Sequence, residues 1–180
     1  MNQENFDPRE LASASDDIKK MFDIDQTARK NNNPEITIKI DQENTVKLKS
    51  IIERIGWPTK SKVGEQSAHY AWLLVQHADQ DIEFQKYCLE SMKKEPTNEV
   101  LQEDIAYLED RILVAENQPQ LYGTQFVIAK DETYGPEEIF EPENLNNRRA
   151  EMSMEPFEEY AETMREMYET WKINNKKSSS

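Results

Sequence analysis

The segment from Gly64 to Asp79 reads GEQSAHYAWLLVQHAD, and it decides the fold that we expect for this chain. Residues 68–75 are apolar on nearly every side of a helix, which is the pattern of a helix buried on most of its faces. Such a helix needs other helices around it, so the segment predicts a helical bundle. Two polar residues, Gln76 and His77, follow the apolar stretch directly.

The segments upstream are divided by glycines and prolines, which are rare in this chain and therefore informative. A first helix is expected from Pro8 to about Arg29, because Pro8 follows a capping aspartate. Residues 35–40 alternate apolar and polar side chains, which favours a short strand or an extended linker. Asp41 would then cap a second helix that ends at Gly56.

Downstream, apolar residues at helical spacing predict three more helices, over residues 64–78, 79–94 and 97–116. Residues 123–128 are the best candidate for a strand. Residues 138–140 would pair back with that strand across a turn at residues 134–136. Pro142 and Pro156 frame two last helical segments.

The expected fold class is mainly α: a single-domain helical bundle with a small β-hairpin near the C-terminal third. A chain of 180 residues has a suitable length for one domain with a core of ordinary size. We expect that domain to span residues 1–173, with residues 1–5 disordered. Residues 174–180 have the composition of a disordered tail.

The charge of the chain limits its partners. The formal net charge is -14, so the chain lacks the basic field that nucleic acids and anionic membranes require. The partner that remains is an unknown small molecule or a protein. No signal peptide or transmembrane stretch is visible, so we expect a soluble, cytoplasmic protein.

The inventory of reactive residues excludes several classes of site. The only cysteine is Cys88, and its helical surroundings favour a buried structural thiol over a reactive one. Two histidines, His69 and His77, are too few for a zinc site of the Cys/His type. The common catalytic and phosphate-binding motifs are absent. We therefore expect no cofactor and no metal site.

His77 is the first candidate catalytic residue, with Gln76 beside it as a candidate ligand-binding residue. Polar side chains next to a buried apolar helix need hydrogen-bond partners, or they face a cavity. A histidine titrates near neutral pH, so His77 is suited to act as a general base. The alternative is a core histidine whose hydrogen bonds are satisfied within the protein.

A second group of candidates lies on the helix predicted over residues 97–116. Asp104, Tyr107 and Arg111 share one face of that helix, and Asp110 sits beside them. These residues would line a pocket in which Arg111 fixes an anionic group and Asp104 orients a donor. A solvated helix face gives the same pattern, and both interpretations stay open.

The third group follows Pro119 and comprises Tyr122, Thr124 and Gln125. Gln125 would point into the same cavity as His77. Trp57 would form an aromatic wall of a pocket, although a packed core tryptophan is the commoner role.

Four blocks of this sequence resemble a bacterial family catalogued as a domain of unknown function. They are residues 56–59, 72–79, 106–111 and 119–125, which read GWPT, WLLVQHAD, AYLEDR and PQLYGTQ. Asp25-Gln26 with Arg29, and Arg148-Arg149 further on, also resemble the family. Ser67 departs from the pattern, where a glycine is expected, and His69 does not belong to it. The resemblance implies no known activity, but it selects polar residues already singled out: Gln76, His77, Asp110, Arg111, Tyr122, Thr124 and Gln125.

Our leading hypothesis is a metal-independent enzyme or ligand-binding domain with a polar pocket centred on His77. His77 would move a proton, Arg111 would hold an anionic group, and Gln76 and Gln125 would orient the substrate. This hypothesis predicts that the four side chains converge in space. The alternative is a non-catalytic adaptor or immunity-type protein that binds a basic partner through its acidic surface, with the polar cluster serving only as a buried structural network.

Overall fold

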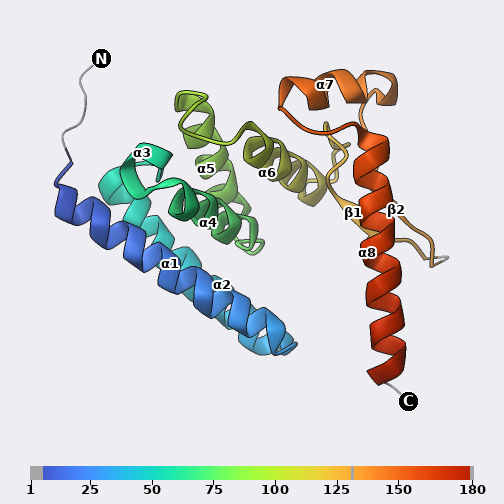
Figure 1. Ribbon diagram of the computed structural model, residues 1–180, viewed down its shortest axis with the longest axis horizontal. Coiled ribbons are helices and arrows are strands. Elements are labelled where there is room, and N and C mark those ends of the chain that lie inside the picture. Colours follow the sequence, from blue (N-terminus) through green and yellow to red (C-terminus); the bar gives the residue numbers. More distant parts are fainter. Residues whose placement is uncertain (1–5, 131, 179–180) are drawn as a thin grey trace. The chain divides into compact units, whose positions relative to one another are not determined.

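The computed structural model describes residues 6–130 and 132–178 (Figure 1). Within these residues the chain forms eight α-helices, one short 3-10 helix and a two-stranded antiparallel sheet. The expected mainly α fold class with a small β-hairpin is confirmed. The contacts within the chain divide it into two compact units, of which the first ends at Ile105 and the second begins at Ala106. Each unit is described by itself.

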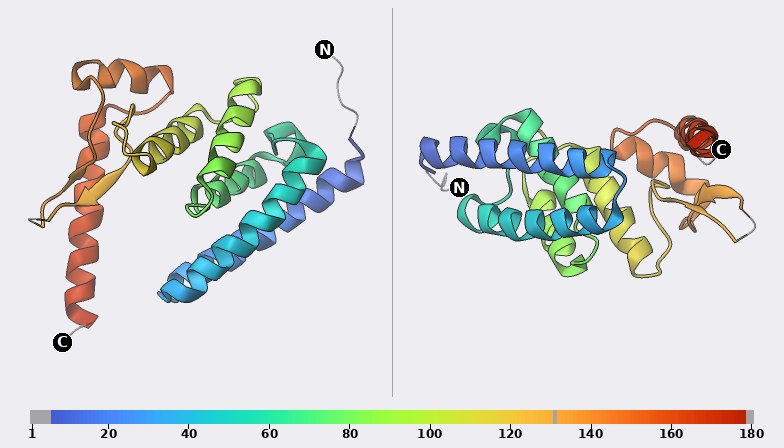
Figure 2. Two further views of the ribbon diagram at one scale, coloured as in Figure 1. Left: turned by 180° about the vertical axis from the view of Figure 1, so that it is seen from behind. Right: turned by 90° about the horizontal axis from the view of Figure 1, so that it is seen from below.

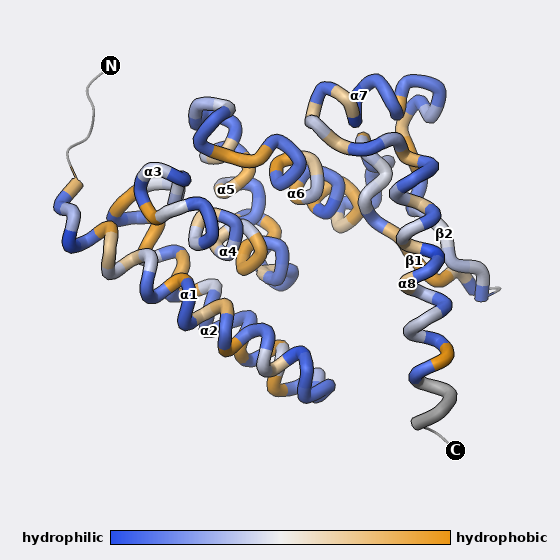
Figure 3. The backbone as a smooth tube through the Cα atoms, viewed as in Figure 1, coloured by the Kyte–Doolittle hydropathy of each residue, from blue (hydrophilic) through white to orange (hydrophobic). Residues whose placement is uncertain are grey.

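The first unit begins with a pair of long helices, α1 (Pro8–Lys30) and α2 (Pro34–Ile55). The two helices lie side by side and antiparallel in every view (Figures 1 and 2). Their buried residues recur every three or four positions. Figure 3 shows hydrophobic and hydrophilic residues interspersed along both helices. The side chains buried there include Ala14, Ile18 and Met21 of α1 and Leu48, Ile51, Ile52 and Ile55 of α2.

The strand or linker expected over residues 35–40 is wrong, since these residues form the first turns of α2. The helix starts at Asn33, whose side chain accepts hydrogen bonds from the N–H groups of Glu35 and Ile36, and Pro34 occupies the first turn. These start signals outweigh the alternating pattern. Because a helix cannot bury alternate residues on one face, Ile36 remains 48% exposed. Asp41 therefore lies inside α2 and does not cap it, whereas Gly56 ends the helix as expected.

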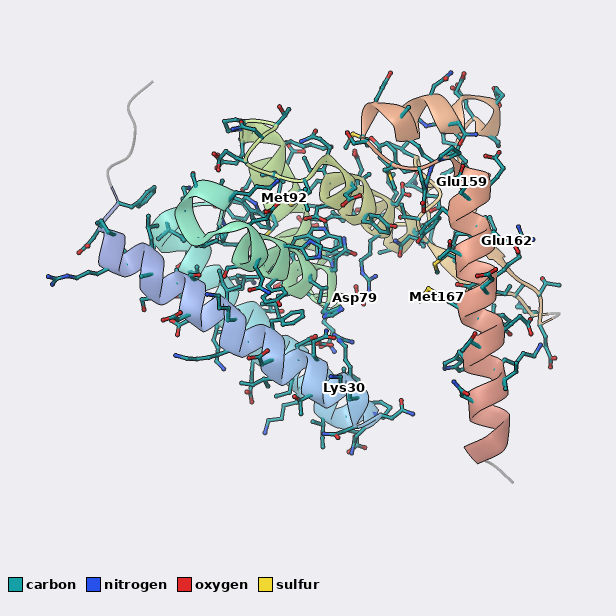
Figure 4. The ribbon with its side chains drawn as sticks, in the orientation of Figure 1. Lys30, Asp79, Met92, Glu159, Glu162 and Met167 are labelled. Carbon is teal, nitrogen blue, oxygen red and sulfur yellow. The ribbon has the colours of Figure 1, made fainter. Side chains whose placement is uncertain are left out.

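The rest of the first unit comprises α3 (Lys60–Val63), α4 (Glu65–Gln76), α5 (Ile82–Lys94) and the start of α6 (Gln102–Ala115). The central helix α4 packs against α1, and Ala71, Leu74 and Val75 are buried. Ser67 fits this contact, since its hydroxyl lies 2.9 Å from the hydroxyl of Ser15 on α1. On α5, Cys88 is fully buried, as expected, near Met92, which is labelled in Figure 4.

The second unit contains the remainder of α6, the hairpin of β1 (Phe126–Ile128) and β2 (Tyr134–Pro136), η1 (Pro142–Asn144), α7 (Leu145–Glu151) and α8 (Phe157–Ser178). The register pairs Phe126 with Pro136 and Ile128 with Tyr134. The expected turn at residues 134–136 is thus wrong, because these residues form the second strand.

Aromatic packing explains where the second strand lies. Tyr134 stacks on Tyr168 of α8 with ring centroids 4.3 Å apart, and it also contacts Phe126 of β1 at 5.4 Å. The expected partner segment, residues 138–140, forms an isolated bridge between Ile139 and Gln120 and is part of neither strand in the described residues.

Helix α8 extends through residues 174–178, where the sequence favours a disordered tail. The disorder expected for residues 1–5 falls outside the described residues. Tyr160 and Ala161 of α8 are buried, whereas Met167 is 62% exposed. Met167 is labelled in Figure 4. None of the helices in the described ranges combines the length and the apolar character that a membrane span requires.

Candidate functional site

His77 lies at the end of α4, where it forms the C-cap of the helix, and its backbone N–H donates to the carbonyl of Leu73 at 3.2 Å. Its ring faces α1, where Asp25 occupies a position in the buried stripe of that helix and is 1% exposed. Nδ1 of His77 lies 2.8 Å from Oδ1 of Asp25. Two residues that are 52 positions apart in the sequence therefore form a direct side-chain pair.

The partners of Nδ1 determine which tautomer His77 adopts. Nδ1 lies within hydrogen-bonding distance of both the Asp25 carboxylate, at 2.8 Å, and Nε of Arg29, at 3.2 Å. A carboxylate can only accept, and the guanidinium can only donate. The shorter contact favours the tautomer in which Nδ1 carries the proton and donates it to Asp25. The Nε–H of Arg29 then donates to the Asp25 carboxylate, and both carboxylate oxygens lie 3.2 Å from Nε. Nε2 of the neutral ring is left unprotonated.

Arg29 connects this pair to α2. Its Nη2 lies 3.1 Å from Oδ1 of Asp25 and 2.7 Å from Oδ1 of Asp41. The four side chains Asp25, Arg29, Asp41 and His77, from α1, α2 and the end of α4, form what we call the His77 cluster. Asp25 and Arg29 are four residues apart on α1, so they meet on one helix face.

The charges in the His77 cluster act differently on its two carboxylates. Burial by itself would raise the pKa of Asp25, but the hydrogen bond and charge of His77, together with those of Arg29, hold that pKa below its usual range. Burial raises the pKa of Asp41, and Arg29 opposes that rise. Asp25 is therefore ionised at neutral pH and is able to stabilise a protonated His77.

A pocket of about 350 Å³ adjoins the His77 cluster. It lies between α2 and the turn that follows α4, and both His77 and Asp41 line it. Asp79 belongs to that turn and is labelled in Figure 4. The His77 side chain is 20% exposed, whereas that of Asp25 is fully buried. The buried acid thus sits behind the ring, and the ring forms part of the pocket wall.

Asp25, Asp41 and His77 also offer one ligand atom each within 4.8 Å of one another, which is the spacing of a metal site. In this structure the guanidinium of Arg29 binds both of these carboxylates. A metal ion at the same place would have to displace an internal cation that is already held by two ion pairs. The arrangement therefore fits an internally neutralised acid–base pair better than a metal centre.

In the second unit, Asp110 holds the loop that follows Pro119. Its fully buried carboxylate accepts hydrogen bonds from the N–H groups of Leu121 at 2.7 Å, Tyr122 at 3.0 Å and Thr124 at 2.9 Å, and from the Thr124 hydroxyl at 2.9 Å. Burial raises the pKa of Asp110, and these donors oppose the rise. The side-chain amide of Gln125 donates to the Thr124 hydroxyl at 3.0 Å.

Two arginines of α7 bind the carbonyl groups of the same loop. Arg148 donates to the carbonyl of Leu121 at 2.8 Å, and Arg149 donates to that of Tyr122 at 2.6 Å. Arg149 is 1% exposed and lies 5.0 Å from the ring centre of Tyr160. In this structure Asp110 accepts the donors of Tyr122 and Thr124, and Arg149 donates to the carbonyl of Tyr122, as expected of a structural network.

The remaining predicted residues fall into different surroundings. Asp104 belongs to the first unit and pairs with His69, whose Nδ1 lies 3.2 Å from Oδ2 of Asp104. Trp57 is 3% exposed and belongs to the core. Tyr107 makes an edge contact with Tyr160, with centroids 6.0 Å apart. Arg111 belongs to the second unit.

The shared site expected of four side chains stays a prediction. Gln76 and His77 belong to the first unit, and Arg111 and Gln125 belong to the second. Sequence reasoning did not single out Asp41, the α2 member of the His77 cluster, because it interpreted that residue as a helix cap. Asp25 and Arg29 were indicated only through the family resemblance.

The comparisons with known proteins give a family and nothing more specific. A family model described as "Family of unknown function (DUF6624)" matches residues 10–173. The chain belongs to this family. The match confirms the resemblance found in the sequence. The DUF6624 match covers both the His77 cluster and the loop bound by Asp110. No curated protein and no solved structure matches the chain.

Proposed function

We propose that this DUF6624 protein is an enzyme that uses His77 as a general base on a small molecule bound in the adjoining pocket. The pairing of His77 with the buried carboxylate of Asp25 carries this proposal. The arrangement supplies what a general base needs: a fixed tautomer, an unprotonated Nε2 and a buried negative charge behind the ring. A histidine that only filled the core would not need a pocket beside it.

The reaction that these residues support begins with a proton transfer. Nε2 of His77 takes a proton from a water molecule or from an acidic O–H, N–H or C–H group of the substrate. The positive charge that then forms on the ring is stabilised by ionised Asp25, which keeps its own proton count unchanged. Arg29 holds Asp25 in place, and Asp41 holds Arg29. His77 later returns the proton to the leaving group or to the product.

The pocket lining limits the substrate. Its charged residues are mostly acidic, and its one cation, Lys49, pairs with Asp81. Ile38, Val46 and Ala78 supply apolar lining. A neutral or positively charged molecule with an apolar part fits this lining, whereas an anion would meet the carboxylates of Asp41, Asp79 and Asp81. Arg111, which we expected to bind an anionic group, belongs to the second unit. Its anion-binding role therefore remains a separate prediction.

The functional alternative from the sequence is an interaction domain that binds a basic protein through its acidic surface. A cytoplasmic location and the absence of nucleic-acid partners are further expectations from the charge and the sequence. Under this alternative the His77 cluster contributes only to stability. The His77 cluster and the pocket next to it favour the enzyme.

The test is a screen of neutral and cationic small molecules by thermal shift, followed by turnover assays on the molecules that bind. His77→Gln retains hydrogen-bonding capacity but cannot act as a base at neutral pH. We expect it to remove turnover while ligand binding is largely kept. His69→Gln is the matched control, because it changes the other histidine of the chain outside the pocket. Equal turnover in the wild type and His77→Gln would refute the proposal.

A further inference from the structure

Gln85 of α5 is a fully buried polar residue close to the end of α4, and it belongs neither to the pocket lining nor to the His77 cluster. Its Nε2 donates to the backbone carbonyl of Val75 at 3.0 Å and lies 3.4 Å from that of Gln76. The same nitrogen is 3.4 Å from Oδ1 of Asp79. One side-chain amide therefore contacts three residues that immediately surround His77 in the sequence.

These contacts involve groups that a helix leaves without intrahelical partners. The last carbonyls of a helix need donors from elsewhere. At the end of α4 the carbonyl of Val75 receives the N–H of Ala78 at 3.0 Å and the amide of Gln85. Gln85 thus acts as a C-terminal cap that another helix provides, and it fixes where α4 stops and where the turn carrying Asp79 begins.

The side-chain carbonyl oxygen of Gln85, Oε1, does not take part in capping α4. Among the described residues, Oε1 of Gln85 is a buried side-chain atom with no hydrogen-bond partner. A buried acceptor without a partner is unfavourable, and an apolar side chain of similar size would avoid that penalty. An unfavourable group of this kind in the core of α5 indicates that the donor end has a role beyond filling space.

We propose that Gln85 is a positioning residue for His77: by capping α4 it holds the imidazole at the distance from Asp25 that keeps Nδ1 protonated and Nε2 available. This inference rests on the proposed role of His77 as the base. His77 is the first residue beyond α4, so its ring position follows from the position of the last helical turn. A shift of that turn lengthens the 2.8 Å contact with Asp25, and the preference for one tautomer weakens.

The test compares Gln85→Met with the wild type. Methionine has nearly the same length and volume but cannot donate a hydrogen bond. The direct readout is long-range 1H–15N NMR of the histidine rings at a pH where they are neutral, which distinguishes the tautomers. The chain has two histidines, so His69 serves as an internal reference. Gln102→Met is the matched control, since Gln102 also donates to a backbone carbonyl of the first unit, that of Val100 at 3.3 Å.

We expect the wild type and Gln102→Met to show a single Nδ1–H tautomer at His77. Gln85→Met should show a mixture, with the signals of His69 unchanged and with the melting temperature equal or higher. Turnover should fall roughly tenfold to a hundredfold, as expected for a misplaced catalytic group. Unchanged His77 ring signals in Gln85→Met would overturn the proposal.

A second variant covers the case in which Gln85→Met does not fold. Gln85→Leu places a smaller apolar side chain in the same buried position and cannot donate a hydrogen bond, so the same tautomer mixture is expected. The result also separates this inference from the proposed function. If the Gln85 variants change the tautomer while His77→Gln keeps full turnover, Gln85 positions His77 but His77 is not the base.

Discussion

Asp110 and Arg149 bind the same loop through opposite backbone groups. The carboxylate of Asp110 accepts the N–H of Tyr122 at 3.0 Å, and the guanidinium of Arg149 donates to the carbonyl of Tyr122 at 2.6 Å. Buried loops are rare because their polar groups lose water. Here one anion and one cation replace that water at the backbone of Tyr122.

Replacing Asp110 by Asn should destabilise the second unit by about 2–4 kcal/mol, because an amide nitrogen would face backbone N–H groups that now donate to a carboxylate. The measurement is urea unfolding followed by circular dichroism. Glu162→Gln on α8 is the control, since Glu162 is exposed and should change the free energy of unfolding by about 0.5 kcal/mol or less. A loss of activity in Asp110→Asn without a loss of stability would instead point to a direct functional role.

Gly123→Ala should destabilise the chain by about 2–3 kcal/mol. Gly123 has φ +70°, and a Cβ at that position would lie 2.8 Å from the Phe157 ring. Gly135→Ala provides the comparison, because nothing lies within 4 Å of its added Cβ and its φ is not positive. Equal melting temperatures for the two variants would contradict the close approach of α8 to this loop.

Replacing Asp25 by Asn should reduce turnover of any substrate found by about 10³- to 10⁴-fold, because an amide can hold the ring in the wrong tautomer. The measurement is kcat/KM, together with the NMR tautomer assay on His77. Asp17→Asn, whose side chain is about half exposed on the same helix, is the control. Retention of the Nδ1–H tautomer in Asp25→Asn would show that the Asp25 carboxylate is not what fixes the ring.

The pair of His69 and Asp104 should make stability depend on pH. The hydrogen bond from His69 to Asp104 raises the pKa of His69, while burial raises that of Asp104. A histidine whose pKa is raised on folding contributes stability that is complete below its unfolded pKa of about 6.5. That contribution is lost as the pH rises through the folded pKa. Unfolding of the wild type and His69→Gln from about pH 5.5 to 9 should therefore converge at the alkaline end.

The sequence predicted the helices well where start and stop signals agreed with the hydrophobic period. Helix α1 and the end of α2 at Gly56 followed from capping residues and glycine. The start of α2 was missed because three isoleucines at alternate positions resemble a strand, although Asn33 and Pro34 fix a helix there. The position of β2 depends on Tyr168, more than 30 residues away, and no local pattern contains that contact.

Of the His77 cluster, the residue pattern alone predicted His77 but not the side chains that pair with it. His77 stood out because it follows an apolar helix, but a pairing across 52 residues depends on how α1 packs against α4. Gln85 gave no signal, because a glutamine in an amphipathic helix is ordinary. Its importance appears only when the acceptors of its amide are known.

The burial of Cys88 has a practical consequence for studying this chain. Burial raises the pKa of its thiol far above the usual range, so the native protein should react with alkylating agents only after α5 opens. Since the chain has no other cysteine, the rate of modification reports the opening of the helix that carries Gln85. Every variant described above can therefore be tested for native-state opening with one unmodified chemical reporter that is already present in the natural sequence.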